Sequence, residues 1–267
     1  IFAALGVFLA LEMSSVAAAA YRNVAEAELL ARNFYGALKV MDFDGPTPRD
    51  QQRRLVNGTI EHGQQFTHPD RRLEPTSYYS HGSGIGILLD ELESEGPQHV
   101  GVIGLGTGTV AAYGRAGDKY RFYEINPLVE EIANTHFWFM DLSPADMEVV
   151  LGDARLSLER ESTQQFDVLA VDAFLGDAIP VHLLTREAVA LYWHHLKPDG
   201  VLAFHVSNPY IDLVPIIAAA AVEMGKEVRV VENEADEANG VHRSRWILVT
   251  SRPGFFEKTN LQMPENL

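Results

Sequence analysis

A carboxylate follows directly after one apolar run of the sequence. Residues 166–171 (FDVLAV) predict a strand, and Asp172 stands at its carboxyl end. A second carboxylate, Asp177, lies further along in a segment that also contains glycine and proline. Carboxylates at such a strand end can take a proton from a substrate or hold a cationic group. Asp172 and Asp177 are therefore the first candidates for chemistry.

A glycine-rich turn follows an earlier apolar run. Residues 100–109 read VGVIGLGTGT, with Gly104, Gly106 and Gly108 at alternate positions. Such glycines let the backbone turn sharply and let a ligand approach the main chain. The dinucleotide form of the motif has glycine where this chain has Thr109. The loop indicates a nucleoside site and argues against a nicotinamide dinucleotide.

Two acids extend this pattern at the ends of the next two predicted strands. Glu124 can accept hydrogen bonds from both hydroxyls of a ribose, and Asp153, which precedes Ala154, can accept from the exocyclic amine of adenine. A glycine loop, a ribose acid and an adenine acid in this order are typical of the S-adenosylmethionine-type fold. The alternative is that Glu124 and Asp153 are only helix N-caps.

The elements that must position these residues alternate between strand and helix. Apolar runs predict strands at 99–104, 120–125, 147–151, 166–171, 200–206, 227–231 and 245–250. Helical patterns fit between them at 108–115, 127–136, 154–160, 185–195 and 212–223. This alternation predicts an α/β fold with a mostly parallel sheet and helices on both faces. The last two strands have no helix between them, which indicates an antiparallel edge pair.

The part of the chain before this sheet differs in character. Residues 33–66 are β-rich, with a strand expected at 34–40 and a hairpin at Asn57-Gly58, and a helix is expected at 76–93. The predicted organisation has four parts: an apolar, possibly membrane-spanning helix at 1–22, a small β-rich domain at 23–75, a Rossmann-like transferase domain at 76–251 and an exposed tail at 252–267.

The first residues and the overall charge bear on partners. Residues 1–20 contain Glu12 as their one charged residue, and this is about the length that spans a bilayer. A transmembrane helix, an interfacial amphipathic helix and a signal peptide are the three readings. The formal charge of −16 over 267 residues argues against nucleic acid and is compatible with a cationic ligand. The chain has no cysteine, which excludes thiolate chemistry and cysteine-bound zinc.

Together these motifs resemble the spermidine synthase (polyamine aminopropyltransferase) family. Over roughly residues 30–250 the resemblance rests on the glycine loop, YEINP at 123–127, GDA at 152–154 and DAF…IP at 172–180. RNFYG at 32–36 and HGQQ at 62–65 resemble a membrane-fused branch, in which a multi-helix membrane domain precedes the synthase domain. On this resemblance, residues 1–20 associate with the membrane and the remaining chain lies in the cytoplasm.

The family resemblance implies a role for each matching residue. The nucleoside part of S-adenosylmethionine, decarboxylated or not, is expected at Gly104, Gly106, Gly108, Glu124, Asp153 and Ala154. Asp172, helped by Tyr79, is expected to take the proton of the attacking amine. Substrate contacts are expected at Gln64, Tyr79 and Asp177, with Glu61 as a further candidate for a distal ammonium. No metal is expected. His205, at the end of the fifth predicted strand, is either a pocket residue or a packed core histidine.

Two departures from the family leave the reaction open. The family usually carries an aspartate where Thr107 stands, and that aspartate contacts the aminopropyl amine of the decarboxylated donor. Its Asp-Ser-Ser-Asp-Pro-type loop is replaced here by DAFLGD at 172–177. We expect an aminopropyltransferase that acts on a polyamine or another small amine. The alternatives are an S-adenosylmethionine-dependent methyltransferase and a catalytically silent synthase-like subunit of a membrane complex. Whether the chain forms a homodimer is also left open.

Overall fold

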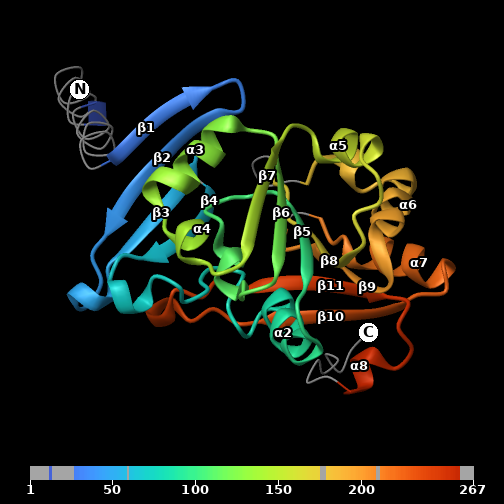
Figure 1. Cartoon of the computed structure of the whole chain (residues 1–267). Helices are drawn as coiled ribbons and strands as arrows, with labels where there is room; N and C mark the ends of the chain where they lie inside the picture. Colours follow the sequence, from blue (N-terminus) through green and yellow to red (C-terminus); the bar gives the residue numbers. More distant parts are fainter. Residues whose placement is uncertain (1–11, 14–26, 59, 175–178, 209–210, 259–267) are drawn as a thin grey trace, which may run out of the picture.

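The chain folds into a small antiparallel sheet beside a large, mostly parallel sheet, as the computed structural model in Figure 1 shows. The structure describes residues 12–13, 27–58, 60–174, 179–208 and 211–258. The apolar residues at 1–11 and 14–20 lie outside this part, so their predicted membrane association is not tested. In the part of the chain that the structure describes, no helix has the length and apolar character needed to cross a membrane.

The small sheet is a four-stranded meander. Its strands run in chain order as β1 (Ala27–Asn33), β2 (Gly36–Phe43), β3 (Gln52–Asn57) and β4 (Ile60–Phe66). The hairpin predicted at Asn57-Gly58 is confirmed, because Asn57 pairs with Ile60 and Gly58 has a φ of 63°. The strand predicted at 34–40 is wrong at its start. Phe34 and Tyr35 form the turn between β1 and β2, and Phe34 is 93% exposed.

The large sheet has seven strands in the order β10-β11-β9-β8-β5-β6-β7. Its strands are β5 (His99–Ile103), β6 (Lys119–Glu124), β7 (Asp146–Leu151), β8 (Phe166–Val171), β9 (Leu196–His205), β10 (Glu227–Asn233) and β11 (Ser244–Thr250). All seven predicted strands are present, and the first five pair in parallel. The last two form the expected antiparallel pair, but β11 lies inside the sheet, antiparallel to β9 as well. This is the Rossmann-like fold of S-adenosylmethionine-dependent transferases, with a β-rich sheet before it.

Helices cover both faces of the large sheet (Figure 1). One face carries α2 (Gly84–Leu92), the 3₁₀ helix η4 (Thr109–Tyr113), α3 (Pro127–His136) and α4 (Phe139–Leu142). The other carries α5 (Ala154–Arg160), α6 (Arg186–His195) and α7 (Val214–Glu223). The helix predicted at 108–115 is the shorter η4. The helix predicted at 76–93 begins only at Gly84, because residues 76–83 are irregular.

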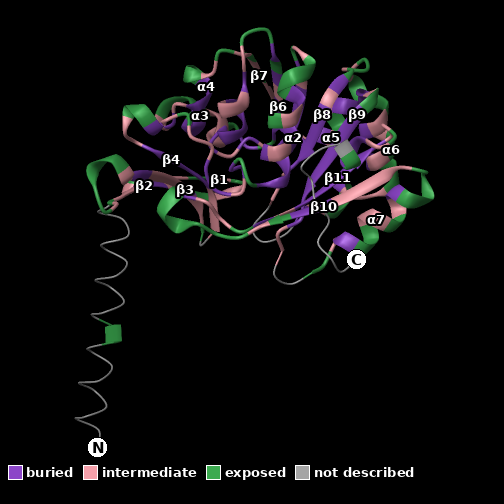
Figure 2. Cartoon of the chain, turned by 90° about the horizontal axis from the view of Figure 1, so that it is seen from below, coloured by how far each residue is buried: buried purple, intermediate pink, exposed green. Residues whose placement is uncertain are grey.

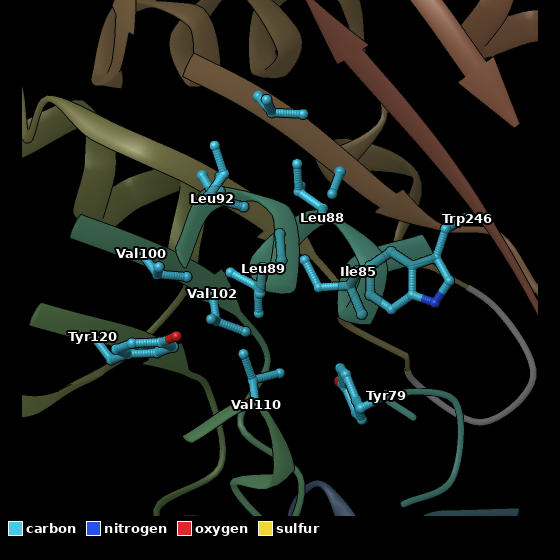
Figure 3. Close-up of a cluster of buried hydrophobic side chains, with 14 of the residues drawn as sticks. Tyr79, Ile85, Leu88, Leu89, Leu92, Val100, Val102, Val110, Tyr120 and Trp246 are labelled. Carbon is cyan, nitrogen blue, oxygen red and sulfur yellow. The ribbon is translucent and has the colours of Figure 1, made fainter. Parts of the chain in front are cut away.

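Alternating side chains of the strands build a core on each face. Figure 3 shows Ile85 and Leu88 of α2 among Val100 of β5 and Trp246 of β11, and all four are fully buried. Each such leucine or isoleucine contributes about 1.5–3 kcal/mol of burial free energy. Figure 2 shows the central strands β8, β9 and β11 in the colour of buried residues.

The end of the described chain also joins the core. Residues 252–267 were expected to be an exposed tail, but α8 (Phe255–Lys258) folds back onto the first face. Phe255 and Phe256 are both nearly completely buried there. The prediction of an exposed tail is therefore wrong for these two residues, because burial removes the large apolar surface of both aromatic side chains from water.

Candidate functional site

A cavity of about 530 Å³ opens at the carboxyl ends of the parallel strands. Its wall combines the tips of β5, β6, β7, β8 and β9 with residues of the small sheet. This volume suits a small organic ligand. Among the described lining residues, four are carboxylic acids and none is lysine or arginine; the acids are Glu61, Glu124, Asp153 and Asp172. The cavity therefore favours cationic or neutral ligands.

The glycine loop forms one wall of the cavity, and its tight backbone explains the glycines. Gly104 has a φ of 103°, and a Cβ there would stand 2.3 Å from the carbonyl oxygen of Asp172. Gly106 has a φ of 55°, and a Cβ there would stand 2.6 Å from the carbonyl oxygen of His62. Both glycines line the cavity, whereas Gly108 packs against Met140 outside it. Two of the three predicted glycines thus lie where a ligand would meet the main chain.

Glu124 occupies the position expected of a ribose-binding acid. Its Oε2 accepts a hydrogen bond from the backbone N–H of Leu105 at 3.0 Å, and its Oε1 accepts from the N–H of Asn126 at 2.8 Å. A carboxylate has about four acceptor sites, so Glu124 can still accept a hydrogen bond from a further donor. Burial raises the pKa of Glu124, while the backbone N–H groups oppose that shift. Glu124 is not the N-cap of α3, because Asn126 caps that helix.

Asp153 is both an N-cap and a cavity residue. Its Oδ1 accepts from the backbone N–H of Leu156 at 2.9 Å, which caps α5, and its Oδ2 lies 2.8 Å from His182 Nε2. Asp153 is therefore the N-cap of α5, although the alternative that it is only an N-cap is not shown. The residue lines the cavity together with Ala154, so capping and ligand contact are compatible at this position.

The tip of β8 carries a largely buried, hydrogen-bonded group of four side chains, which we name the Asp172 cluster. It consists of Asp172, Tyr79, His205 and Ser207. The Tyr79 hydroxyl donates to Asp172 Oδ2, and His205 Nδ1 lies 2.6 Å from Asp172 Oδ1. On its other side, His205 Nε2 lies 2.7 Å from Ser207 Oγ. Side-chain exposure is 5% for Asp172 and 3% for His205, so both are shielded from bulk solvent.

Aromatic rings hold the imidazole of His205 in place. The ring stacks with Tyr78 at 4.5 Å between centroids and with Trp246 at 4.8 Å. The indole Nε1 of Trp246 donates to the carbonyl oxygen of Tyr78 at 3.1 Å, which joins these two supports. Burial raises the pKa of Tyr78 well above its usual range, and the charges of Asp172 and Glu61 add to this. Tyr78 therefore stays protonated.

Strand β4 contributes one residue that was a candidate, Glu61, and one that was not, His62. Glu61 and His62 line the cavity, whereas Gln64 lies outside its lining and donates from Nε2 to the carbonyl oxygen of Gly240 at 2.6 Å. The Nε2 of His62 is buried and has no hydrogen-bond partner among the described residues. Burial lowers the pKa of His62, although Asp172 opposes the shift, so this ring is neutral at pH 7.

Not all of the remaining predicted residues lie at the cavity. Asp172 lines the cavity, and Tyr79 reaches it only through its bond to Asp172. Asp177 lies outside the described residues. Sequence reasoning left His205 undecided between core and pocket and missed Ser207. The sequence signal for Ser207 was its position two residues after His205 at the carboxyl end of β9, since alternate residues of a strand face the same side.

Comparison with known proteins gives short sequence matches. The chain is 34% identical over 113 residues to the polyamine aminopropyltransferase of Vibrio vulnificus (40% of this chain, 36% of that protein). It is 36% identical over 112 residues to the N-terminal histidine N-methyltransferase of Emericella nidulans (40% and 19%). These matches span only about a third or less of the curated relatives. No family model matches the chain.

Solved structures match over most of the chain. The spermidine synthase from Thermotoga maritima superposes with a TM-score of 0.59 and 15% identity, over 90% of this chain and 81% of that one. A probable spermidine synthase from Corynebacterium glutamicum superposes with a TM-score of 0.65 and 15% identity, over 84% and 79%. The chain is similar to the spermidine synthases. The local sequence matches and the shared fold together support this family, while a membrane-fused branch is not shown.

Proposed function

We propose that the chain transfers an aminopropyl group from decarboxylated S-adenosylmethionine to a polyamine or another small amine. The observation that carries this proposal is the acidic cavity, which joins a nucleoside-type wall to the Asp172 cluster at neighbouring strand ends. The named activities of the similar proteins, polyamine aminopropyltransferase and spermidine synthase, support it.

The nucleoside part of the donor fits the wall formed by β5, β6 and β7. Gly104 and Gly106 line the cavity with main chain, and the Glu124 carboxylate retains acceptor capacity for a ribose hydroxyl. Asp153 and Ala154 lie at the expected adenine end. Because the Gly104 backbone lies against the carbonyl of Asp172, the nucleoside wall and the Asp172 cluster are adjacent.

The acceptor side suits an amine that carries charge. Alkylamines have a pKa near ~10 and are mostly protonated at neutral pH, so carboxylates attract them and one proton must leave before attack. Glu61 and Asp172 supply negative charge to this side of the cavity. Arg54 and His242 pair with Glu61 at 3.4 and 3.5 Å, which fixes that carboxylate beside the cavity. Asp177 remains a proposed second contact.

Product analysis tests the proposal directly. The purified chain is incubated with putrescine or spermidine and with decarboxylated S-adenosylmethionine, and the products are identified by mass spectrometry. We expect methylthioadenosine and an amine that is heavier by one aminopropyl group. An absence of both products with every amine tested, together with intact binding of methylthioadenosine, contradicts the proposal.

A second candidate is methyl transfer from S-adenosylmethionine itself. Two observations favour it: Thr107 stands where the resembled family has an aspartate, and one matched relative is named as a methyltransferase. Calorimetry with the parent and the decarboxylated donor separates the two candidates, because the aminopropyltransferase prefers the decarboxylated form. A chain that binds neither donor nor methylthioadenosine is the catalytically silent subunit.

Membrane attachment through residues 1–20 and a homodimer are separate proposals. Fractionation of cells that express the chain tests the first, since an anchored chain sediments with the membranes. Light scattering of the purified chain tests the second through its mass in solution.

A further inference from the structure

Both carboxylate oxygens of Asp172 already have side-chain partners. Tyr79 donates to Oδ2, and the imidazole of His205 lies against Oδ1. The carboxylate is 5% exposed, and neither partner is a solvent molecule that an incoming amine could displace easily. Each oxygen keeps a second lone pair, so it is the low exposure of the carboxylate, rather than a lack of acceptor sites, that limits its contact with an amine in the cavity.

Ser207 presents a free acceptor to the cavity instead. Its Oγ accepts a hydrogen bond from the backbone N–H of Arg245 at 2.8 Å and lies 2.7 Å from His205 Nε2. With one lone pair used by Arg245, the Ser207 hydroxyl hydrogen is free to point at Nε2. This arrangement assigns the His205 hydrogen to Nδ1, where it donates to Asp172. The second lone pair of Ser207 Oγ remains for a donor in the cavity.

Intrinsic basicity also separates the two candidate acceptors. An alkylammonium has a pKa near ~10.4, an imidazole near ~6.5 and a carboxylic acid near ~3.9. Moving the proton from the amine to a carboxylate is thus unfavourable by roughly six powers of ten, and moving it to an imidazole by roughly four.

We propose that Ser207 relays the proton of the attacking amine to His205, and that Asp172 is a positioning residue that orients and stabilises the imidazole. This inference rests on the proposed aminopropyl transfer and replaces Asp172 as the expected base. Ser207 is the group that touches the amine. The required series of contacts, Ser207 Oγ to His205 Nε2 and His205 Nδ1 to Asp172 Oδ1, is complete in the structure.

The proton and electron balance is simple. The ammonium gives one proton to Ser207 Oγ while the Ser207 hydroxyl proton passes to His205 Nε2. The freed lone pair of the amine forms a bond to the aminopropyl carbon attached to sulfur. The carbon–sulfur bond breaks, and its electron pair leaves on the sulfur of methylthioadenosine. The charge on both sides is equal, with imidazolium and a secondary ammonium as the charged products.

Other groups near the cluster bear on its pH dependence. The titratable and charged residues around it are Tyr78 and Tyr79 before α2, Glu61 and His62 on β4, Asp172 after β8, His242 before β11 and Arg245 on β11. Tyr78 stays protonated and His62 stays neutral at pH 7, because burial disfavours the charged form of each. Neither competes with His205 for the proton near neutral pH.

Single-turnover transfer to putrescine tests the relay with three variants. Ser207→Ala should slow transfer about 10–100-fold at pH 7, and Ser207→Thr, which keeps a hydroxyl, should stay within a few-fold of wild type. His205→Gln should slow it about 10²–10⁴-fold, the usual contribution of a general base. Each deficit should shrink as the pH rises towards 10, because a growing fraction of the amine is then already deprotonated. A merely structural loss would not recover in this way.

A matched control removes another buried histidine. His195 is fully buried and bonded to the Leu158 carbonyl and the Gln164 N–H, away from the cavity lining. His195→Gln should lower stability without changing the pH profile of transfer. If His205→Gln fails to bind methylthioadenosine, the comparison of Ser207→Ala with Ser207→Thr tests the relay instead. A Ser207→Ala rate within two-fold of wild type at pH 7 overturns the proposal.

Nuclear magnetic resonance keeps this inference separate from the proposed function. A far-downfield imidazole N–H signal in the wild type that disappears in both His205→Gln and Asp172→Asn supports the Asp172–His205 bond. The ¹⁵N shift of His205 Nε2 should also change in Ser207→Ala. If the wild type transfers nothing, the proposed function fails, and these signals alone decide the hydrogen-bond chain. Absence of the downfield signal overturns it.

Discussion

Gly63 of β4 lies directly against Thr107 of the glycine loop. A Cβ on Gly63 would stand 2.3 Å from Thr107 Oγ1. Thr107 is 1% exposed, bonds to Thr109 Oγ1 at 2.8 Å and is absent from the cavity lining. The position where the resembled family has an acid is therefore a packing contact between the two sheets in this chain. A side chain at residue 107 cannot reach a ligand in the cavity unless β4 moves.

The Thr107→Asp variant should lose stability and should not restore a donor contact. An aspartate there would be buried beside Gly63, and a buried polar group without a partner costs about 1–3 kcal/mol, more when charged. Chemical denaturation should show a lower free energy of unfolding. Thr107→Ser keeps the hydroxyl and is the control, with a much smaller loss. A Thr107→Asp chain of wild-type stability with tighter binding of the decarboxylated donor would contradict this interpretation.

Nucleoside binding should weaken on acidification through Glu124. Burial places the pKa of this carboxyl above its usual range, and the ionised form is the better acceptor for ribose hydroxyls. Affinity for methylthioadenosine should therefore be highest at pH values well above the raised pKa of Glu124, and it should fall as the pH decreases through that pKa. The fall should begin at a higher pH than it would for an exposed glutamate. Calorimetry between pH 8 and pH 5 measures this.

A variant identifies the group responsible for that pH dependence. Glu124→Gln keeps the size of the side chain but replaces one acceptor oxygen by a donor. We expect it to bind methylthioadenosine at least about tenfold more weakly, since hydrogen bonds to a charged group contribute about 1.5–3 kcal/mol. Its affinity should also vary less with pH. Equal pH profiles for the variant and the wild type would rule out Glu124.

Gly104→Ala should disrupt the cavity, and Gly82→Ala should not. A Cβ at Gly104 meets the carbonyl of Asp172 at 2.3 Å, and the φ of 103° adds strain of about 1–3 kcal/mol. Gly82 has open space around it and is exposed, so an alanine there is a matched control. Thermal unfolding and methylthioadenosine binding measure both effects. Similar melting temperatures for the two variants would contradict the close approach of Gly104 to Asp172.

Asn33→Asp should loosen the small sheet from the large one. Asn33 Nδ2 donates to Asn126 Oδ1 at 2.6 Å, while Asn33 Oδ1 accepts from the Tyr35 N–H. Aspartate keeps the second bond and loses the first, so the variant isolates the contact between the sheets. We expect a loss of about 0.5–1.5 kcal/mol and faster amide exchange in β1 and β2. Exchange confined to the Tyr35 turn would contradict a role in joining the sheets.

The pattern of apolar residues predicted the strands of the large sheet correctly, but it did not predict which residues pack closely together. Runs such as 99–104 and 166–171 have burial on both faces, which leaves a continuous apolar signal. Gly84 and Gly86 are another matter: in the sequence they weaken a helix, but they admit Trp246 and the Ser80 carbonyl at close range. The approach of Trp246 to Gly84 joins residues far apart in the chain, so no local pattern reveals it.

The site shows the same division between local and distant information. Glu124, Asp153 and Asp172 were predictable because each follows a strand of a parallel sheet, and the carboxyl ends of those strands meet. Gln64 was not, because the pairing of β3 with β4 shifts register between Leu55 and Val56. A register shift alters which side chains of β4 face the cavity. The spacing of Ser207 from His205 is visible in the sequence, but the hydrogen bond that Ser207 accepts from the Arg245 N–H is not.

The place of β11 in the sheet determines when the site can form during synthesis. β11 inserts between β9 and β10, and it supplies Trp246 beneath His205 and the backbone N–H that orients Ser207. The glycine loop and Glu124 emerge from the ribosome more than a hundred residues earlier. The proposed nucleoside wall is thus synthesised long before the residues that complete the proposed proton relay. Until β11 has left the ribosome, that relay lacks the indole of Trp246 beside His205 and the backbone N–H that orients Ser207.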